Sequence, residues 1–347
     1  MRISIIALSL FLPLFIASGC GSEPESPGVG PECTLVWTSY RGGAPNIWTM
    51  DLPDGSPKQL TNLSEGCGKW GVVLSSDNWV YFGGKYEGDW EVFRIPRDGG
   101  QIQRLTNSDQ YDGDPTVSPD GERVCFLTKR WYFAQADREL ASMSSSGGDV
   151  IRLTESEGSD DSPVWSPTGE RVAFVHAIDA GMFTVATLDP NSPGTIEYWT
   201  GDLEGAYEPR WSPDGSSIIC VGSYNGTKDI WRVEIPSGEM VNLTNSNQSD
   251  EKPEISPDGS QIAHQVFRDG QWDIAITQMD GSGSLYLTDD SAKDMWPCWS
   301  PDGSWVFWVS YRDNDYEIYG APADGSDGPF RMTDSPGDDI RPQCWPK

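Results

Sequence analysis

The hydrophobic residues of this chain fall into short runs, each bounded by turn residues. Residues 306–309 (Val-Phe-Trp-Val) form one continuous apolar run, as expected of a strand covered on both faces. Ser-Pro-Asp-Gly at 300–303 precedes it and predicts a tight hairpin, because Pro fixes φ and Gly readily adopts positive φ. A second turn at Asp324-Gly325 separates two further apolar runs. With the segment that begins at Pro297, the pattern predicts four short antiparallel strands, the content of one propeller blade.

This pattern recurs with a period of about 45 residues, which is typical of propellers, solenoids and repeat arrays. A hydrophobic residue followed by Thr ends each repeat. These residues are Thr61, Thr106, Thr154, Thr200, Thr244, Thr288 and Thr333. In six repeats a Pro follows nine positions later, namely Pro115, Pro163, Pro209, Pro253, Pro297 and Pro342.

The repeat resembles the Pro-Asp propeller repeat of the TolB family. The shared features are Pro-x-Trp-Ser-Pro-Asp-Gly, as at 209–215, an Ile-aromatic strand such as Ile230-Trp231, then Asp-Gly and Leu-Thr. The resemblance covers residues 34–347 and implies a propeller fold. It says little about function, because function belongs to sites rather than to scaffolds.

The two ends of the chain set the blade count. The first repeat starts at Thr34 without a Pro-x-x-Ser-Pro segment, whereas residues 342–346 form such a segment with nothing after it. We therefore predict an all-β, seven-bladed propeller, closed by a C-terminal strand that completes blade 1. TolB itself has six blades and a preceding α/β domain, for which no room exists between Cys20 and Thr34, so its Tol-system role carries over weakly.

The N-terminus resembles a bacterial export signal. An apolar stretch from Ile3 to Ile16 and small residues before Cys20 are similar to a lipobox, with Cys20 as the acylated residue. Gly21 favours passage to the outer membrane. We expect a signal peptide at 1–19, a lipid-anchored tether at 20–32 and the propeller at 33–347, held in the cell envelope on the periplasmic or cell-surface side of the outer membrane.

The cysteines suggest one link across the ring closure. An exported protein permits disulfides, and no Cys-x-x-Cys pair is present. Alignment on the repeat places Cys33 and Cys344 in the same composite blade, one residue away from direct opposition. We predict this disulfide, with Cys67 or Cys298 as alternative partners.

The formal net charge of −29 argues against nucleic acid, whose phosphates attract basic surfaces. Plain solubility explains the charge better than a specific cationic partner does. Nucleic acid is therefore excluded as a partner, and contact with the membrane is expected through the lipid anchor alone.

Five aspartates recur three positions before the repeat Pro, with Ala206 as the exception. They are Asp112, Asp160, Asp250, Asp294 and Asp339. They should begin the innermost strands and ring one channel mouth, where they are a candidate site for a partner or a cation such as Ca²⁺. A residue that repeats with the blade is usually part of the blade, so we favour a structural role and expect no cofactor.

Blade 3 departs from the repeat by about four extra residues, which include Trp131-Tyr132-Phe133. Exposed aromatic clusters usually mark contacts, so this loop is a candidate partner surface on the same channel face. The alternative, which we slightly favour, is that it folds back over the blade edge. The irregular second blade around Cys67 is the other departure.

Catalysis has little support. Gly-x-Ser-x-Gly, His-Glu-x-x-His and P-loop motifs are absent from the sequence, and the two histidines, His176 and His264, fall on second strands. Oligogalacturonate lyases have a similar propeller but rely on several His. We therefore predict a non-catalytic, TolB-like envelope scaffold that binds another envelope protein. The alternative is a propeller that binds or cleaves carbohydrate with a metal-assisted site on the channel face.

Overall fold

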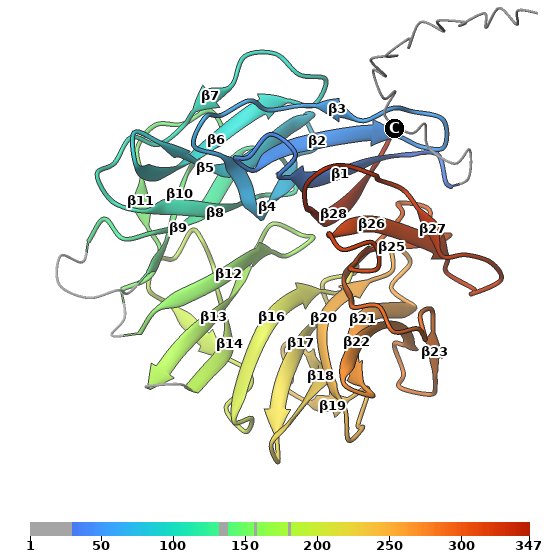
Figure 1. The fold of residues 1–347 in the computed structure, drawn as a ribbon. Coiled ribbons are helices and arrows are strands. Elements are labelled where there is room, and N and C mark those ends of the chain that lie inside the picture. Colours follow the sequence, from blue (N-terminus) through green and yellow to red (C-terminus); the bar gives the residue numbers. More distant parts are fainter. Residues whose placement is uncertain (1–29, 132–137, 156–157, 180–181) are drawn as a thin grey trace, which may run out of the picture.

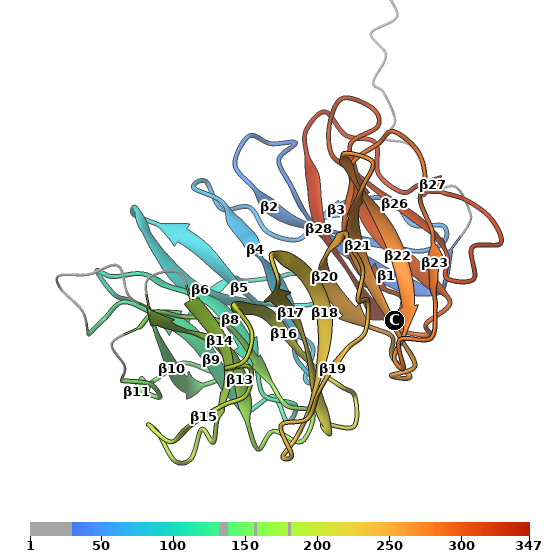
Figure 2. The ribbon, with the colours of Figure 1, turned by 90° about the horizontal axis from the view of Figure 1, so that it is seen from below.

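The computed structural model describes residues 30–131, 138–155, 158–179 and 182–347. These residues form seven four-stranded antiparallel sheets arranged around a central axis (Figure 1). Figure 2 shows the same ring turned by 90°. The predicted all-β, seven-bladed propeller is confirmed. No segment of the described ranges forms a helix with the length and hydrophobicity needed to cross a membrane.

Each blade places its first strand next to the channel and its fourth at the rim. The inner strands of blades 1 to 7 are β28 (Asp339–Pro346), β4 (Cys67–Leu74), β8 (Asp112–Val117), β12 (Asp160–Trp165), β16 (Gly205–Trp211), β20 (Ser249–Ile255) and β24 (Asp294–Trp299). The second strands are β1 (Cys33–Ser39), β5 (Trp79–Tyr86), β9 (Arg123–Thr128), β13 (Val172–Asp179), β17 (Ser217–Tyr224), β21 (Gln261–Arg268) and β25 (Trp305–Ser310).

The two remaining strands of each blade complete the sheet outwards. The third strands are β2 (Asn46–Asp51), β6 (Asp89–Pro96), β10 (Glu139–Ser144), β14 (Met182–Leu188), β18 (Thr227–Glu234), β22 (Gln271–Gln278) and β26 (Glu317–Pro322). The outer strands are β3 (Lys58–Gln59), β7 (Gln103–Arg104), β11 (Ile151–Arg152), β15 (Ile196–Tyr198), β19 (Met240–Asn242), β23 (Ser284–Tyr286) and β27 (Phe330–Arg331).

The C-terminal strand closes the ring, as predicted. Strand β28 pairs antiparallel with β1, and Leu35 lies opposite Cys344. The sulfurs of Cys33 and Cys344 are joined in a disulfide across this pairing. The alternative partners, Cys67 and Cys298, are free and buried.

The core lies between neighbouring blades. Strand β1 is buried along its whole length, and Trp37 from this strand packs with Phe307 and Ile318 of blade 7. On the other side, Val36 packs with Phe82 of blade 2. Both faces of a sheet are thus covered by apolar side chains, which explains the continuous apolar runs of the second strands.

The Leu-Thr signature is explained by one hydrogen bond that recurs in all seven blades. The Thr hydroxyl accepts from a backbone N–H of the third strand, as Thr333 Oγ1 does from Ile318 at 2.9 Å. In most blades the same hydroxyl also donates to a carboxylate at the start of that strand. Thr333 donates to Glu317 Oε2 at 2.5 Å. This contact ties the segment that follows the fourth strand to the third strand.

The Ser-Pro-Asp-Gly turns have an equally local cause. Ser300 Oγ donates to Asp302 Oδ1 at 2.6 Å and accepts from the N–H of Trp305 at 2.9 Å. Gly303 takes a φ of +71°, which glycine adopts without steric cost. The turn therefore forms from its own residues.

Candidate functional site

A β-bulge interrupts the inner strand of every blade. In blade 7 the pairing shifts so that Trp296 and Pro297 together lie opposite the one residue Trp308. Blades 3, 4, 5, 6 and 1 shift in the same way at their own repeat proline. Bulges of this kind redirect a side chain and are frequent beside functional sites.

The residue before each repeat proline is the one that the bulge redirects. In six blades it has a positive φ of 50° to 56°, a region that non-glycine residues seldom occupy. These residues are Asp114, Ser162, Glu208, Lys252, Trp296 and Arg341. In the irregular blade 2 a glycine, Gly71, lines the channel instead, with a φ of +110°.

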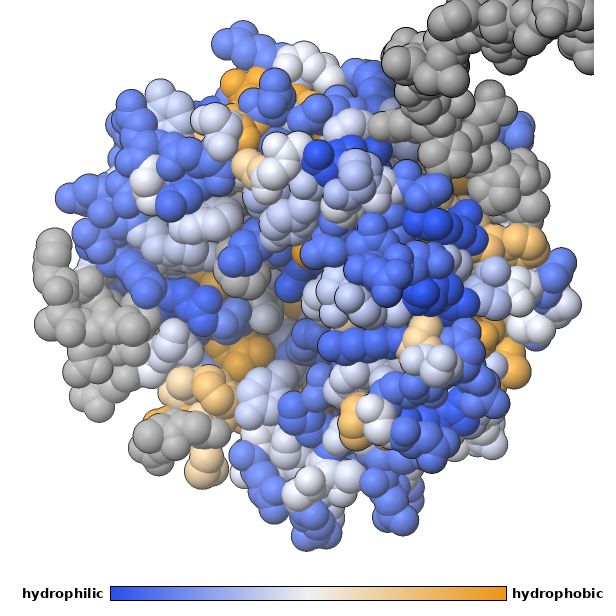
Figure 3. All heavy atoms as spheres, in the orientation of Figure 1, coloured by the Kyte–Doolittle hydropathy of each residue, from blue (hydrophilic) through white to orange (hydrophobic). Residues whose placement is uncertain are grey.

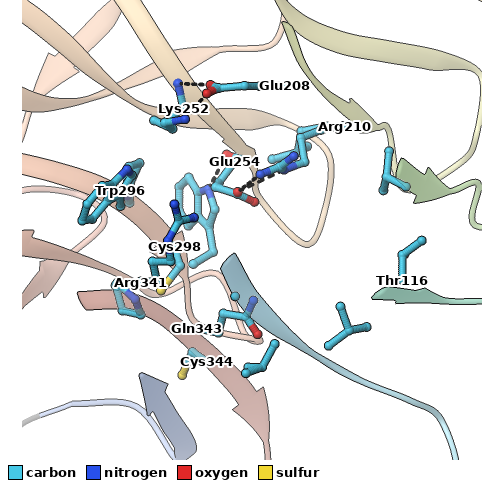
Figure 4. A pocket seen from close by; sticks show the side chains of 18 of the residues that line it. Thr116, Glu208, Arg210, Lys252, Glu254, Trp296, Cys298, Arg341, Gln343 and Cys344 are labelled. Carbon is cyan, nitrogen blue, oxygen red and sulfur yellow. Dashed lines mark hydrogen bonds and ion pairs between the residues drawn. The ribbon is translucent and has the colours of Figure 1, made fainter. Parts of the chain in front are cut away.

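These positions converge on one cavity of about 700 Å³ in the central channel. Residues from all seven inner strands line it, and Figure 4 shows side chains from several blades pointing into the same space. The residue type at the bulge differs in every blade, whereas the surrounding backbone repeats. The lining therefore varies from blade to blade and is not set by the repeat.

Blades 5 and 6 contribute two ion pairs to the lining (Figure 4). Lys252 forms an ion pair with Glu208, and its backbone N–H also donates to Glu208 Oε2 at 2.9 Å. Two positions further along each strand, Arg210 contacts Glu254 at 2.7 Å. The charge of Glu254 raises the pKa of Arg210. Both pairs fix charged groups at the wall of the cavity.

The opposite side of the cavity holds charges without such partners. The guanidinium of Arg341 lies 5.2 Å from the centre of the Trp296 ring. Asp114 accepts a hydrogen bond from the hydroxyl of Tyr111 at 3.0 Å, and its buried Oδ1 has no partner among the described residues. Burial raises the pKa of Asp114 to about 6. Burial also lowers the pKa of Arg341.

The five repeated aspartates lie at the starts of inner strands, but all are buried and none lines the cavity. Each contacts a basic side chain of its own blade. Asp112 contacts Arg130, Asp160 contacts His176 at 2.8 Å, Asp250 contacts His264 at 3.2 Å, Asp294 contacts Arg312 at 3.2 Å and Asp339 contacts Arg41 at 2.9 Å. The structure thus places the five carboxylates against side chains of their own blades and away from the cavity.

Both histidines of the sequence belong to these pairs. His176 and His264 are buried on second strands, and His264 Nε2 also lies 2.9 Å from Thr277 Oγ1. Neither histidine lines the channel cavity. Within the described ranges, no group of three or more His, Cys, Asp or Glu side chains is arranged to hold a metal ion.

The aromatic loop of blade 3 is described only at its first residue. Trp131 is half-buried and packs against a cluster that contains Tyr81 and Phe126. The guanidinium of Arg152 lies 5.2 Å from its ring. Tyr132 and Phe133 lie outside the described residues. Trp131 thus packs on apolar residues of blades 2 and 3, and it does not line the channel cavity.

A second cavity of about 290 Å³ lies between blades 4 and 5. Phe183, Tyr207, Val175 and Val221 form its apolar wall. It shares Glu208 and two residues of β12 with the channel cavity, so the two spaces adjoin. Figure 3 shows exposed hydrophobic residues in this region of the surface.

The residues before the repeat prolines, which we call the pre-proline ring, were not predicted as a site from the sequence. The signal was present, because the position before each repeat proline varies among Asp, Ser, Glu, Lys, Trp and Arg while its neighbours recur. The five aspartates do repeat, but they do not line the cavity. The residue that does not repeat is the one that faces the channel.

The fold and this ring define a β-propeller with a cavity in its central channel. The chain belongs to the TolB beta propeller domain family, whose model matches residues 26–197 and 207–346. An uncharacterized protein of Agrobacterium fabrum is 32% identical over 95 residues, 27% of this chain and 32% of that protein. A TolB homolog of Chlorobium chlorochromatii is 28% identical over 106 residues, 30% of this chain and 23% of the relative. The matches span about a third or less of these relatives.

Solved structures show the same fold at low identity. A putative TolB from Agrobacterium tumefaciens has a TM-score of 0.55 and 24% identity, covering 71% of this chain and 92% of that one. An oligogalacturonate lyase in complex with manganese has a TM-score of 0.70 and 16% identity, covering 83% and 85%. A puromycin-hydrolyzing peptidase of Mycobacterium tuberculosis has a TM-score of 0.71 and 14% identity, covering 90% and 53%. The propeller fold therefore occurs in enzymes as well as in proteins named TolB.

Proposed function

We propose that this protein is a non-catalytic binding module of the bacterial cell envelope, and that its channel cavity takes a polar segment of another envelope protein. The observation that carries the proposal is the pre-proline ring. One bulge per blade turns a different side chain into a shared cavity, at a backbone conformation that non-glycine residues rarely keep without a purpose.

Several features support binding without catalysis. The two histidines are buried in aspartate pairs that hold strand starts. Cys298 lines the cavity, but burial raises the pKa of its thiol well above the usual value, so it remains a protonated, poor nucleophile. The charged groups of blades 5 and 6 are already paired. Such a lining is suited to recognition of a polar chain.

Family membership and the N-terminal sequence together support a location in the envelope. The relatives named TolB homolog belong to the same family of propellers. An acylated Cys20 followed by a tether at 20–32 would hold the propeller beside a membrane. Both segments lie outside the described residues, and lipid anchoring is part of the proposal.

A second candidate, carbohydrate binding or cleavage, is favoured by one observation. Trp296 lines the cavity, and an indole ring is a good surface for stacking on a sugar. The likeness to an oligogalacturonate lyase is a likeness of fold at 16% identity. This candidate predicts a rise in melting temperature with an envelope glycan, with or without Ca²⁺.

The test is affinity capture from solubilised envelopes with the tagged protein, with and without EDTA. The informative variant is Glu208→Gln with Lys252→Gln, which removes one channel ion pair without leaving a lone charge. A matched control is Arg171→Gln with Glu197→Gln, an ion pair outside the channel.

We expect the wild type and the control variant to capture the same envelope protein, and the channel variant to lose it. Capture that is unaffected by the channel variant would overturn the proposal. So would a thermal shift with a glycan and no captured protein, which would favour the second candidate.

A further inference from the structure

The strongest unexplained feature of the cavity is the corner formed by blades 7 and 1. Trp296 and Arg341 occupy the same bulge position in neighbouring inner strands, with φ values of +54° and +55°. Large side chains rarely adopt this conformation, and it costs free energy that the rest of the blade must offset. The conformation places the guanidinium of Arg341 5.2 Å from the indole centre.

Arg341 differs from the other basic residues that line the cavity. Arg210 and Lys252 each form an ion pair with a carboxylate, whereas among the described residues the guanidinium of Arg341 forms none. It lies over the Trp296 ring and interacts at longer range with the charges of Asp114 and Glu208. Arginine carries five N–H donors and stays charged at any pH of interest. The stack on Trp296 holds the group in place without using those donors.

The wall beside Arg341 leaves room for a ligand. The equivalent position in blade 2 is Gly71, and a Cβ placed there would meet only the side chain of Gln343, at 3.9 Å. The ring therefore has a gap next to Arg341, on the side opposite Trp296. Gln343 and Gly71 both line the same cavity.

We infer that this corner binds a carboxylate group of the ligand, held by Arg341 and admitted beside Gly71. The inference rests on the proposed function, because it assigns a chemistry to part of the same cavity. A guanidinium matches a carboxylate with two parallel hydrogen bonds, which gives both affinity and orientation. Trp296 is then a positioning residue that acts through Arg341.

Asp114 and Glu208 are the two carboxylates whose charges act on Arg341, and Glu208 is already paired with Lys252. The groups that face Asp114 are Tyr111, Asp161, Arg138 and Arg341. An incoming carboxylate is repelled by ionised Asp114 and not by the protonated acid. Since the pKa of Asp114 is raised to about 6, the affinity for a carboxylate should fall as the pH rises past that value.

The test uses isothermal titration of the full chain with paired probes. N-acetyl-glycylglycine is compared with its C-terminal amide, and galacturonate with galactose, at pH 5 and pH 8. We expect each acid to bind at least tenfold more tightly than its neutral partner, and more tightly at pH 5. The pair that shows the larger difference identifies whether the carboxylate comes from a chain terminus or an acidic sugar.

Three variants test whether binding of the acid probes depends on Arg341 and Asp114. Arg341→Gln should abolish the preference for acid over amide, and Arg341→Lys should keep part of it. Asp114→Asn should bind the acid equally well at both pH values. Equal binding of acid and neutral probes, or no binding of any probe to a folded wild type, would overturn the inference.

The two proposals fail in different ways. If Arg341→Gln still captures the envelope protein and the acid probes do not bind, the carboxylate site is wrong and the proposed function stands. If the acid probes bind through Arg341 but no protein is captured, the carboxylate site stands and the proposed function is wrong.

Discussion

The guanidinium of Arg341 lies 5.2 Å from the centre of the Trp296 ring, and the two residues belong to neighbouring blades at the same position of the repeat. This contact forms only because each inner strand bulges at its repeat proline. The scaffold thus turns one side chain per blade into the channel, and the sequence is free to vary at that position. The side chains that differ between the blades therefore lie at the position before the repeat proline.

The first prediction concerns the Thr residues that end each blade. Thr333→Val removes a donor to the buried Glu317 and an acceptor for the Ile318 N–H. We expect a loss of about 2–4 kcal/mol in the free energy of unfolding, because the Ile318 N–H and Glu317 Oε2 each lose a buried hydrogen bond, the latter to a carboxylate. Urea denaturation at pH 8 measures it.

Thr200→Val is the matched control for that change. Thr200 also accepts from a backbone N–H, but its other partner is the neutral hydroxyl of Thr184 at 3.1 Å. We expect a loss of only about 1–2 kcal/mol. Equal losses at the two positions would show that the carboxylate is not essential to the blade closure.

The second prediction concerns pH. Burial raises the pKa of Glu317 to about 7 from its ordinary value, despite Arg331 at 3.2 Å. Between about pH 4.5 and 7 the folded state therefore holds this proton more tightly than the unfolded chain does, so stability falls as pH rises through that window. Relative to Glu317→Gln, the wild type should lose on the order of 2–3 kcal/mol from pH 4.5 to 7.5.

Chemical denaturation at a series of pH values measures this difference. Glutamine is neutral at every pH and resembles the protonated acid in shape. Stability curves that stay parallel for wild type and Glu317→Gln would contradict the raised pKa.

The third prediction concerns the ring closure. Replacing Cys33 and Cys344 with Ser removes the link between β1 and β28, which lie 311 residues apart in the chain. We expect a loss of about 2–5 kcal/mol in the free energy of unfolding. Reduced wild type should unfold at the same denaturant concentration as the double variant, and oxidised wild type at a higher one. Identical midpoints with and without reductant would refute the link.

The fourth prediction separates packing from contact at Trp131. This side chain packs on an apolar cluster shared by blades 2 and 3, so Trp131→Ser should lower the free energy of unfolding by about 1–2 kcal/mol and leave partner capture intact. Leu285→Ser, at an exposed position of β23, is the control and should change stability little. Lost capture with unchanged stability would instead identify Trp131 as a contact residue.

Much of the fold was predictable because its causes are local. The turn at 300–303 depends on adjacent residues, and the pairing of Thr333 with the third strand joins two residues of one blade, Thr333 and Ile318. The seventh blade was predictable from the unmatched segment at 342–346, which β28 contains.

The site was less predictable, because it depends on a bulge that only pairing between strands reveals. The sequence marks Pro297 as a repeat residue but does not state that Trp296 takes a positive φ. The repeated Asp294 drew attention for its regularity, and its burial beside Arg312 follows from the packing of a whole blade. The conformation of Trp296 and the burial of Asp294 could therefore be known only from the folded structure.

Site-specific photo-crosslinking in living cells tests the central claim, that the protein binds its partner through the pre-proline ring. A photoreactive phenylalanine at Ser162 samples the ring at an exposed position, since this bulge position accepts Trp and Arg in other blades. The same residue at Ser282, on an exposed turn of blade 6, is the control. The account predicts one envelope protein crosslinked at 162 and none at 282. Crosslinks to that protein at 282, with none at 162, would contradict it.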